Sequence, residues 1–184
     1  LYKAAKDAGV KAIIGCEFYI TSGSRFEKSA QSEAKTYRLT LLAKNNQGYQ
    51  NLLTLSTLAS LEGFYYRPRI DWDLLQKHHQ GLIALSGSKW GELPQAILEN
   101  IITNYKTLFD TDYYLEISRH SEIPEYQIIE NQLLQLSKEY QLPLVATQNS
   151  HYLKPEDANP HDILLCIGNQ TNILDPNRKK YEGD

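Results

Sequence analysis

Short runs of apolar, β-branched or aromatic residues alternate along this chain with stretches in which apolar residues recur every three or four positions. Runs this brief predict strands, and several lack polar alternation, which is typical of strands buried on both faces. The predicted strands are Lys11–Ile14, Tyr37–Ala43, Leu82–Leu85, Tyr113–Ile117 and Leu144–Thr147. Helical spacing appears between or after them at Leu52/Leu55/Leu58, Leu93/Ile97/Ile101, Ile129/Leu133/Leu136/Tyr140 and Ile163/Ile167.

This alternation predicts parallel βαβ units and therefore an α/β fold, either an open doubly wound sheet or a closed barrel with helices outside. The pattern alone does not separate these two architectures. Two polar segments, Thr21–Lys35 and Gly63–Asp73, are longer than ordinary connections and are interpreted as surface excursions. A length of 184 residues favours one domain over two.

Composition excludes some functions. The formal net charge is −3, so the chain offers no basic patch of its own for gripping a phosphate backbone. No apolar run approaches the length of a membrane span and no secretory signal opens the chain, so a cytoplasmic protein without membrane contact is expected.

The chain has no Met, and Leu1–Gly9 resembles the last turns of a helix that ends at Gly9. We therefore expect a piece of a larger protein.

Candidate chemistry is sought just beyond the carboxyl ends of the strands, where α/β proteins place their working residues. Glu17 could serve there as an oxygen ligand for a divalent metal, as a general base, or simply as an ion-paired surface carboxylate. His151 follows a very apolar strand, where an imidazole commonly binds metal or transfers protons. His120 also follows a strand, but a hydrogen-bonded loop histidine is the simpler interpretation.

A series of strings covers nearly the whole chain and carries a specific resemblance. They are AGVKAIIGCEFYI, LTLLAKNNQGYQNLLTLSTLASLEGFYYRPRID, GLIALSGSKWGELPQAILEN, YYLEISRH and PLVATQNSHYLKPEDANPHDILLCI. In this order they resemble the polymerase-and-histidinol-phosphatase (PHP) domain of bacterial DNA polymerase III alpha subunits.

The resemblance implies a distorted seven-stranded β/α barrel, similar to a TIM barrel, whose first strands would precede Leu1. The whole chain, 1–184, would then be a single partial PHP domain, without the N-terminal strands and the downstream polymerase regions. Metal-binding members of the family hold two or three divalent ions in a ring of His, Asp, Glu and Cys, and hydrolyse phosphoesters there.

The resemblance also implies which residues would belong to that ring. Glu17 and His151 match family ligands, whereas Arg38, Ser88 and Asn149 stand where the family has His, Cys and Asp. Arg carries no lone pair for a metal, and neutral Ser and Asn remove negative charge that a divalent cation needs. The expected site is therefore vestigial, without a bound metal or a catalytic residue of its own.

These implications favour a structural and partner-binding module of a replicative DNA-directed DNA polymerase, a nucleotidyltransferase that uses Mg²⁺ elsewhere in the parent chain. Expected partners are the rest of the alpha chain, a proofreading exonuclease subunit, other replicase subunits, and DNA through the parent protein. The alternative is an active phosphoesterase, a 3′–5′ proofreading exonuclease or a pyrophosphatase, that uses Zn, Mn or Mg. A free-standing phosphatase is disfavoured by the GYQNL and RPRID strings.

The replacement of family metal ligands also predicts one ion pair. Without a cation, Glu17 would be poorly solvated in a cavity, so something positive should compensate. We expect Arg38 to pair with Glu17 at hydrogen-bonding distance, roughly 2.7–3.2 Å, with Asn149 or His151 completing its hydrogen bonds.

Overall fold

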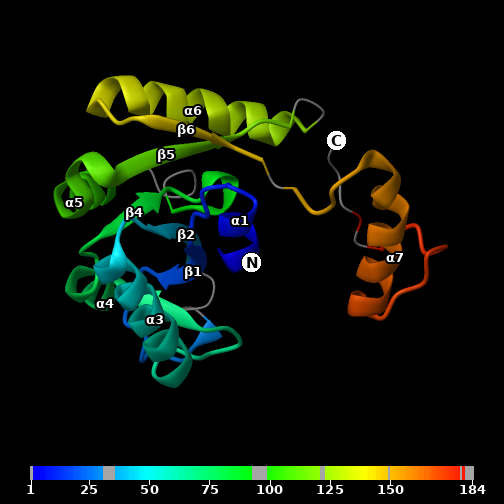
Figure 1. The fold of residues 1–184 in the computed structure, drawn as a ribbon, viewed down its shortest axis with the longest axis horizontal. Helices are drawn as coiled ribbons and strands as arrows, with labels where there is room; N and C mark the ends of the chain where they lie inside the picture. Colours follow the sequence, from blue (N-terminus) through cyan, green and yellow to red (C-terminus); the bar gives the residue numbers. More distant parts are fainter. Residues whose placement is uncertain are drawn as a thin grey trace.

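A computed structural model of the chain describes residues 2–30, 36–92, 99–120, 123–148, 150–178 and 180. Within these ranges strands and helices alternate, and the architecture is mixed α/β (Figure 1). The elements are α1 (Tyr2–Asp7), β1 (Gly15–Thr21), β2 (Thr36–Ala43), α3 (Asn46–Leu61), β3 (Arg69–Asp71), α4 (Trp72–Lys77), β4 (Leu82–Leu85), the 3₁₀ turn η1 (Ser88–Trp90), α5 (Glu99–Phe109), η2 (Asp110–Asp112), β5 (Tyr113–Ser118), α6 (Pro124–Tyr140), β6 (Leu144–Thr147), η3 (Pro155–Asp157) and α7 (Ala158–Asn169).

The strands form one six-stranded sheet in the order β3-β1-β2-β4-β5-β6. Strand β2 runs antiparallel to both of its neighbours, whereas the pairs β1–β3, β4–β5 and β5–β6 are parallel. Over the described ranges the sheet is open, with β3 and β6 at its edges. This arrangement is consistent with part of a β/α barrel that is not closed.

Four of the five predicted strands are present, as β2, β4, β5 and β6, and they are neighbours in that order, but two parts of the prediction are wrong. β2 is antiparallel, because the apolar pattern of a strand carries no information on its direction. The predicted strand Lys11–Ile14 is not a strand, and the first strand is Gly15–Thr21, because the residues that enter the core are Phe18 and Ile20, whereas Ile13 is 69% exposed. The run Lys11–Ile14 is apolar without being buried.

Helix α3 packs closely on the sheet. Its N-cap is Asn45, whose side-chain Oδ1 accepts a hydrogen bond from the Gly48 backbone N–H at 3.0 Å. A Cβ atom on Gly48 would lie 1.8 Å from the carbonyl oxygen of Gly81, so only glycine allows this approach. The adjacent Asn51 donates to the Gln80 carbonyl oxygen at 2.7 Å. The GYQNL string therefore fixes this helix against the turn before β4.

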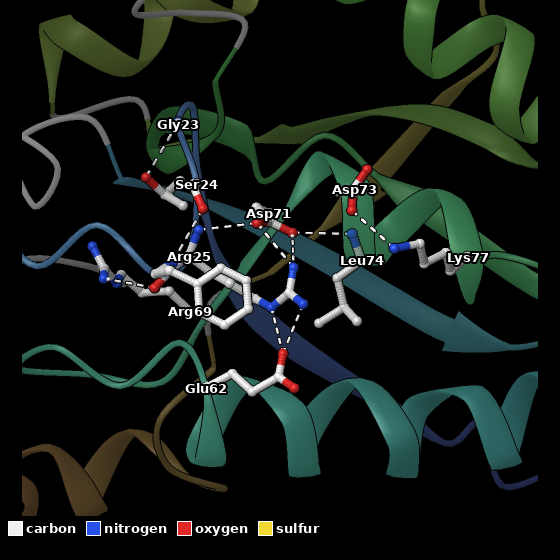
Figure 2. A network of polar contacts seen from close by, with 11 residues as sticks. Gly23, Ser24, Arg25, Glu62, Arg69, Asp71, Asp73, Leu74 and Lys77 are labelled. Atoms are coloured by element: carbon white, nitrogen blue, oxygen red, sulfur yellow. Dashed lines mark hydrogen bonds and ion pairs between the residues drawn. The ribbon is translucent and has the colours of Figure 1, made fainter.

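The two segments interpreted as surface excursions are partly buried, which corrects that prediction. Asp71 accepts hydrogen bonds from the backbone N–H and from Nη1 of Arg25, both at 2.9 Å, and from the N–H of Leu74 at 3.0 Å (Figure 2). Arg25 also donates through Nε to Glu62 at 2.7 Å. Only 10% of the Arg25 side chain and 6% of the Asp71 side chain are exposed. An ion pair here replaces the apolar contacts that a core segment usually makes.

Arg69 is fully buried in the same region. Its guanidinium donates to three backbone carbonyl oxygens, of Gly63 at 3.1 Å, Arg25 at 3.3 Å and Glu27 at 2.9 Å. The RPRID string thus supplies a short edge strand, β3, and the side chains that tie residues 22–30 to it (Figure 2).

The hydrophobic core lies between the sheet and the helices that cover it. Its fully buried members include Leu41 and Leu115 from the sheet, Leu55 from α3 and Ile102 from α5. Helix α6 runs along β5 and β6, while α7 stands apart from the sheet after an extended segment (Figure 1). In the part of the chain that the structure describes, no helix is both long and apolar enough to cross a membrane.

Candidate functional site

A pocket of about 90 Å³ lies where β1, β2, η1, β5 and β6 come together. Five residues were expected at a vestigial site, and three of them, Glu17, Arg38 and Ser88, line this pocket. The complete lining is Glu17, Arg38, Gly87, Ser88, Trp90, Glu116, Ser118, Tyr126, Thr147 and Gln148. We refer to it as the Glu17–Arg38 pocket.

The predicted ion pair between Arg38 and Glu17 is present. In the antiparallel ladder Arg38 lies opposite Tyr19, and Glu17 lies two residues before Tyr19, so both side chains emerge on the same face. The distance from Arg38 Nη1 to Glu17 Oε1 is 3.3 Å, just beyond the expected range. The side chains are 36% and 48% exposed, so water screens the pair.

Aromatic rings flank the same guanidinium. The Arg38 Cζ atom lies 5.3 Å from the centre of the Trp90 ring and 5.8 Å from that of Tyr19. Both distances are within the range of a cation–π contact. Gly87 has a left-handed backbone, φ 81°, and a Cβ there would lie 2.2 Å from the Arg38 carbonyl oxygen. This glycine therefore lets η1 approach β2 and brings Trp90 to Arg38.

The pocket contains a second carboxylate, Glu116, which was not among the residues predicted from the sequence. The Thr147 hydroxyl donates to Glu116 Oε1 at 2.7 Å, and the hydroxyl oxygens of Thr147 and Ser118 lie 3.1 Å apart. The alternation of β5 could have revealed it, because Tyr113 and Leu115 are buried while Glu116 and Ser118 share the opposite face. The pocket thus holds two carboxylates and one guanidinium.

The two histidines lie elsewhere. His151 is not among the residues that line the Glu17–Arg38 pocket, and its ring centre lies 5.3 Å from that of His161. His120 packs edge-on against Tyr126 at 4.6 Å, beside Arg119 and α6. Asn149 falls outside the described residues. After β6 the chain leads away from the sheet towards α7 (Figure 1).

The pocket combines two carboxylates, Glu17 and Glu116, with the Arg38 guanidinium and several hydroxyls. Among the described residues, no three His, Cys, Asp or Glu side chains are placed to share an ion. Of the groups present, Glu17 is paired with a permanent cation, and Ser88, Ser118 and Thr147 are neutral hydroxyls. The contacts that the structure shows in the pocket are an ion pair and hydrogen bonds.

Fold and pocket together define a partial β/α-barrel domain with a polar pocket between its strands. The family model described as PHP domain matches residues 1–120. The chain belongs to the PHP domain family.

Similar proteins extend the match beyond residue 120. Over 98% of its length the chain is 45% identical to DNA polymerase III subunit alpha of Borreliella burgdorferi. It is 41% identical over 99% of its length to the protein of that name in Treponema pallidum, and 40% identical over its full length to the one in Thermus aquaticus. In each case the match covers 16% of the relative, so the chain spans about a sixth of the length of these relatives.

Proposed function

We propose that this chain is the PHP portion of a replicative DNA polymerase III alpha subunit and acts in DNA replication as a structural, partner-binding module with a degenerate metal site. The supporting observation is the Arg38–Glu17 ion pair inside the pocket. Glu17 is the carboxylate in this pocket that matches a family ligand. The Arg38 guanidinium, on the neighbouring strand, pairs with it and offsets its charge.

The charge of the pocket supports this proposal. A guanidinium stays protonated at any physiological pH and has no lone pair to donate, so it repels a divalent cation at short range. The cation–π contacts with Trp90 and Tyr19 hold Arg38 at this position. Ser88 and Asn149, which stand where the family has Cys and Asp, remove two further anionic or soft donors.

The wider role rests on the relatives, which carry the name DNA polymerase III subunit alpha. By this proposal, chain elongation with Mg²⁺ takes place in other regions of the parent subunit. The partners are the rest of the alpha chain, a proofreading exonuclease subunit and other replicase subunits, and DNA is reached through the parent protein. A cytoplasmic location fits this role.

Elemental analysis of the full-length parent subunit tests the loss of the metal site. We expect zinc, manganese and iron to be far below one ion per chain after dialysis. The combined variant Arg38→His, Ser88→Cys and Asn149→Asp restores the family's donor types and should raise metal retention. The matched control changes Arg119→His, an exposed arginine outside the pocket, and should retain no more metal than the unmodified subunit.

The alternative, an active 3′–5′ exonuclease or pyrophosphatase, makes the opposite prediction. Near-stoichiometric zinc or manganese in the unmodified subunit, lost together with phosphoesterase activity on Glu17→Gln, would overturn the structural role.

A further inference from the structure

A pocket of about 290 Å³ lies at the amino-terminal end of helix α7 and shares no residue with the Glu17–Arg38 pocket. It is lined by the first turns of α7, including His161 and Asp162, and by Arg178 and Lys180 from the segment that follows the helix. The positive end of the helix dipole adds to the electrostatic field there. The function proposed above makes no use of this pocket, which we call the α7 pocket.

The α7 pocket carries more positive than negative charge. Its lining contains two permanent or nearly permanent cations, Arg178 and Lys180, and one carboxylate, Asp162. The Glu17–Arg38 pocket has the opposite balance, with two carboxylates and one guanidinium. In a chain whose formal net charge is −3, a concave site with an excess of basic groups favours an anionic ligand.

Arg178 is held firmly but keeps one hydrogen-bond donor unused. Its side chain is only 6% exposed. The Nη2 atom donates to Asp162 Oδ2 at 2.6 Å, and Nε donates to the Ile173 carbonyl oxygen at 2.9 Å. The Nη1 atom is buried and has no hydrogen-bond partner among the described residues. A buried donor of this kind costs free energy unless an acceptor reaches it.

The carboxylate that holds Arg178 has an unused acceptor as well. Within the described ranges, Asp162 Oδ1 is buried and has no hydrogen-bond partner. Both residues line the α7 pocket, so a ligand that satisfies them must bring an acceptor for Arg178 and a hydrogen-bond donor for Asp162. An anion with acceptor oxygens alone would leave Oδ1 unpaired and would be repelled by it.

We propose that the α7 pocket binds a phosphate group that carries a proton. One phosphate oxygen accepts a hydrogen bond from Arg178 Nη1, the protonated oxygen donates to Asp162 Oδ1, and Lys180 supplies a second positive charge. Inorganic phosphate keeps at least one proton at neutral pH. A phosphate monoester keeps one on a fraction of its molecules, because its second pKa is about 6. The site is independent of the Glu17–Arg38 pocket and of any metal there.

The size of the pocket limits the ligand. Its volume of about 290 Å³ is near the lower end of the range for small-molecule sites, roughly 300–1,000 Å³. The phosphate group therefore belongs either to the free ion or to a mononucleotide.

Calorimetric titration of the full-length parent subunit with inorganic phosphate tests the proposal. A chelator is present, so that no metal bridges the anion to the protein. We expect saturable binding. Sulfate has the same tetrahedral shape but no proton at neutral pH, so it cannot donate to Asp162 and should bind at least about tenfold more weakly.

Two variants locate the binding site. Lys180→Gln removes an exposed cation from the pocket and should weaken phosphate binding several-fold. Asp162→Asn replaces the carboxylate with an amide that can donate, so sulfate should then bind as well as phosphate, a gain that a misfolded variant cannot produce. The matched control is Arg119→Gln, which removes an arginine from an ion pair outside the pocket and should leave both affinities unchanged.

Titration with deoxyadenosine 5′-monophosphate distinguishes the two sources of the phosphate group. Tighter binding than that of inorganic phosphate supports a nucleotide site, and equal or weaker binding supports a site for the free ion. Three results would overturn the proposal: no saturable binding of phosphate, equal affinities of the unmodified subunit for sulfate and phosphate, or affinities that neither Lys180→Gln nor Asp162→Asn changes. Metal content is measured separately, so a failure of the degenerate-site proposal leaves these results unaltered.

Discussion

The guanidinium of Arg38 lies 3.3 Å from the carboxylate of Glu17 and is more than one third exposed. A fully buried pair would cost about 3–5 kcal/mol when one partner is removed. Because water screens this pair, we expect a coupling free energy of about 0–1 kcal/mol in a double-mutant cycle of Arg38→Ala and Glu17→Gln. Urea unfolding of the four proteins measures it, and a coupling above about 2 kcal/mol would contradict the screened geometry.

The Arg25–Asp71 ion pair should behave differently, because both side chains are almost fully buried. We expect Asp71→Ala to lower the free energy of unfolding by about 3 kcal/mol, since it removes one of the two carboxylates that pair with Arg25, leaving Glu62, and also removes the cap of α4. Asp73→Ala is the control, because Asp73 lies two residues after Asp71 and forms an exposed pair with Lys77. Its cost should be far smaller, because water screens exposed helical pairs. Equal losses for the two variants would refute the assignment of burial.

A substitution at Gly48 tests the close approach of α3 to the turn before β4. A methyl group there would meet the Gly81 carbonyl oxygen, so Gly48→Ala should destabilise the fold by about 1–3 kcal/mol. Gly168 in α7 has open space around its Cα atom, so Gly168→Ala should be neutral or stabilise by up to about 1 kcal/mol through helix propensity. The contrast is measured by chemical denaturation, and a tolerated Gly48→Ala would show that the helix can shift.

Glu92 gives the fold a pH dependence. Desolvation raises its pKa above the ordinary value of 4.5, although a hydrogen bond from Tyr105 at 3.4 Å opposes the shift. The folded state therefore holds the proton more tightly than the unfolded state, and this contribution to stability is lost as pH rises through the folded pKa. Glu92→Gln should raise the melting temperature at pH 8 and change it little at pH 4.

The control for that prediction is Glu125→Gln. Glu125 is exposed, and a hydrogen bond from Lys89, with its charge, lowers the pKa of the carboxyl. Its small contribution is present above the ordinary pKa of glutamate and is lost in acid, so this variant should show no gain at pH 8. A gain of equal size in both variants would point to net charge instead of burial.

The apolar pattern located the central and later strands well. Leu82–Leu85 and Leu144–Thr147 match β4 and β6 at both ends, because each is a short apolar run bounded by polar or turn residues. The pattern failed at β3, since Arg69 and Asp71 are charged residues that are buried by pairing and hydrogen bonding. Hydropathy assigns such residues to the surface, and only the three-dimensional partners reveal their burial.

The family resemblance supplied the positions of Glu17, Arg38, Ser88 and His151, and the first three line the pocket whereas His151 does not. The Arg38–Glu17 pair followed from the loss of ligands and the adjacency of two strands. Glu116 was missed, although its place in the β5 alternation marks the face it shares with Ser118. His151 could not be placed from the sequence, because the course of the chain after β6 is set by contacts that local pattern does not encode.

Arg69 gives residues 22–30 a property that their lack of regular secondary structure conceals. One guanidinium holds the carbonyl oxygens of Arg25 and Glu27, and a guanidinium does not lose its proton at any pH that the fold survives. A lysine could not replace it, since a single ammonium group lacks the planar fork that reaches several oxygens at once. This loop should therefore open only when β3 itself detaches, and in exchange with heavy water it should behave as a member of the sheet.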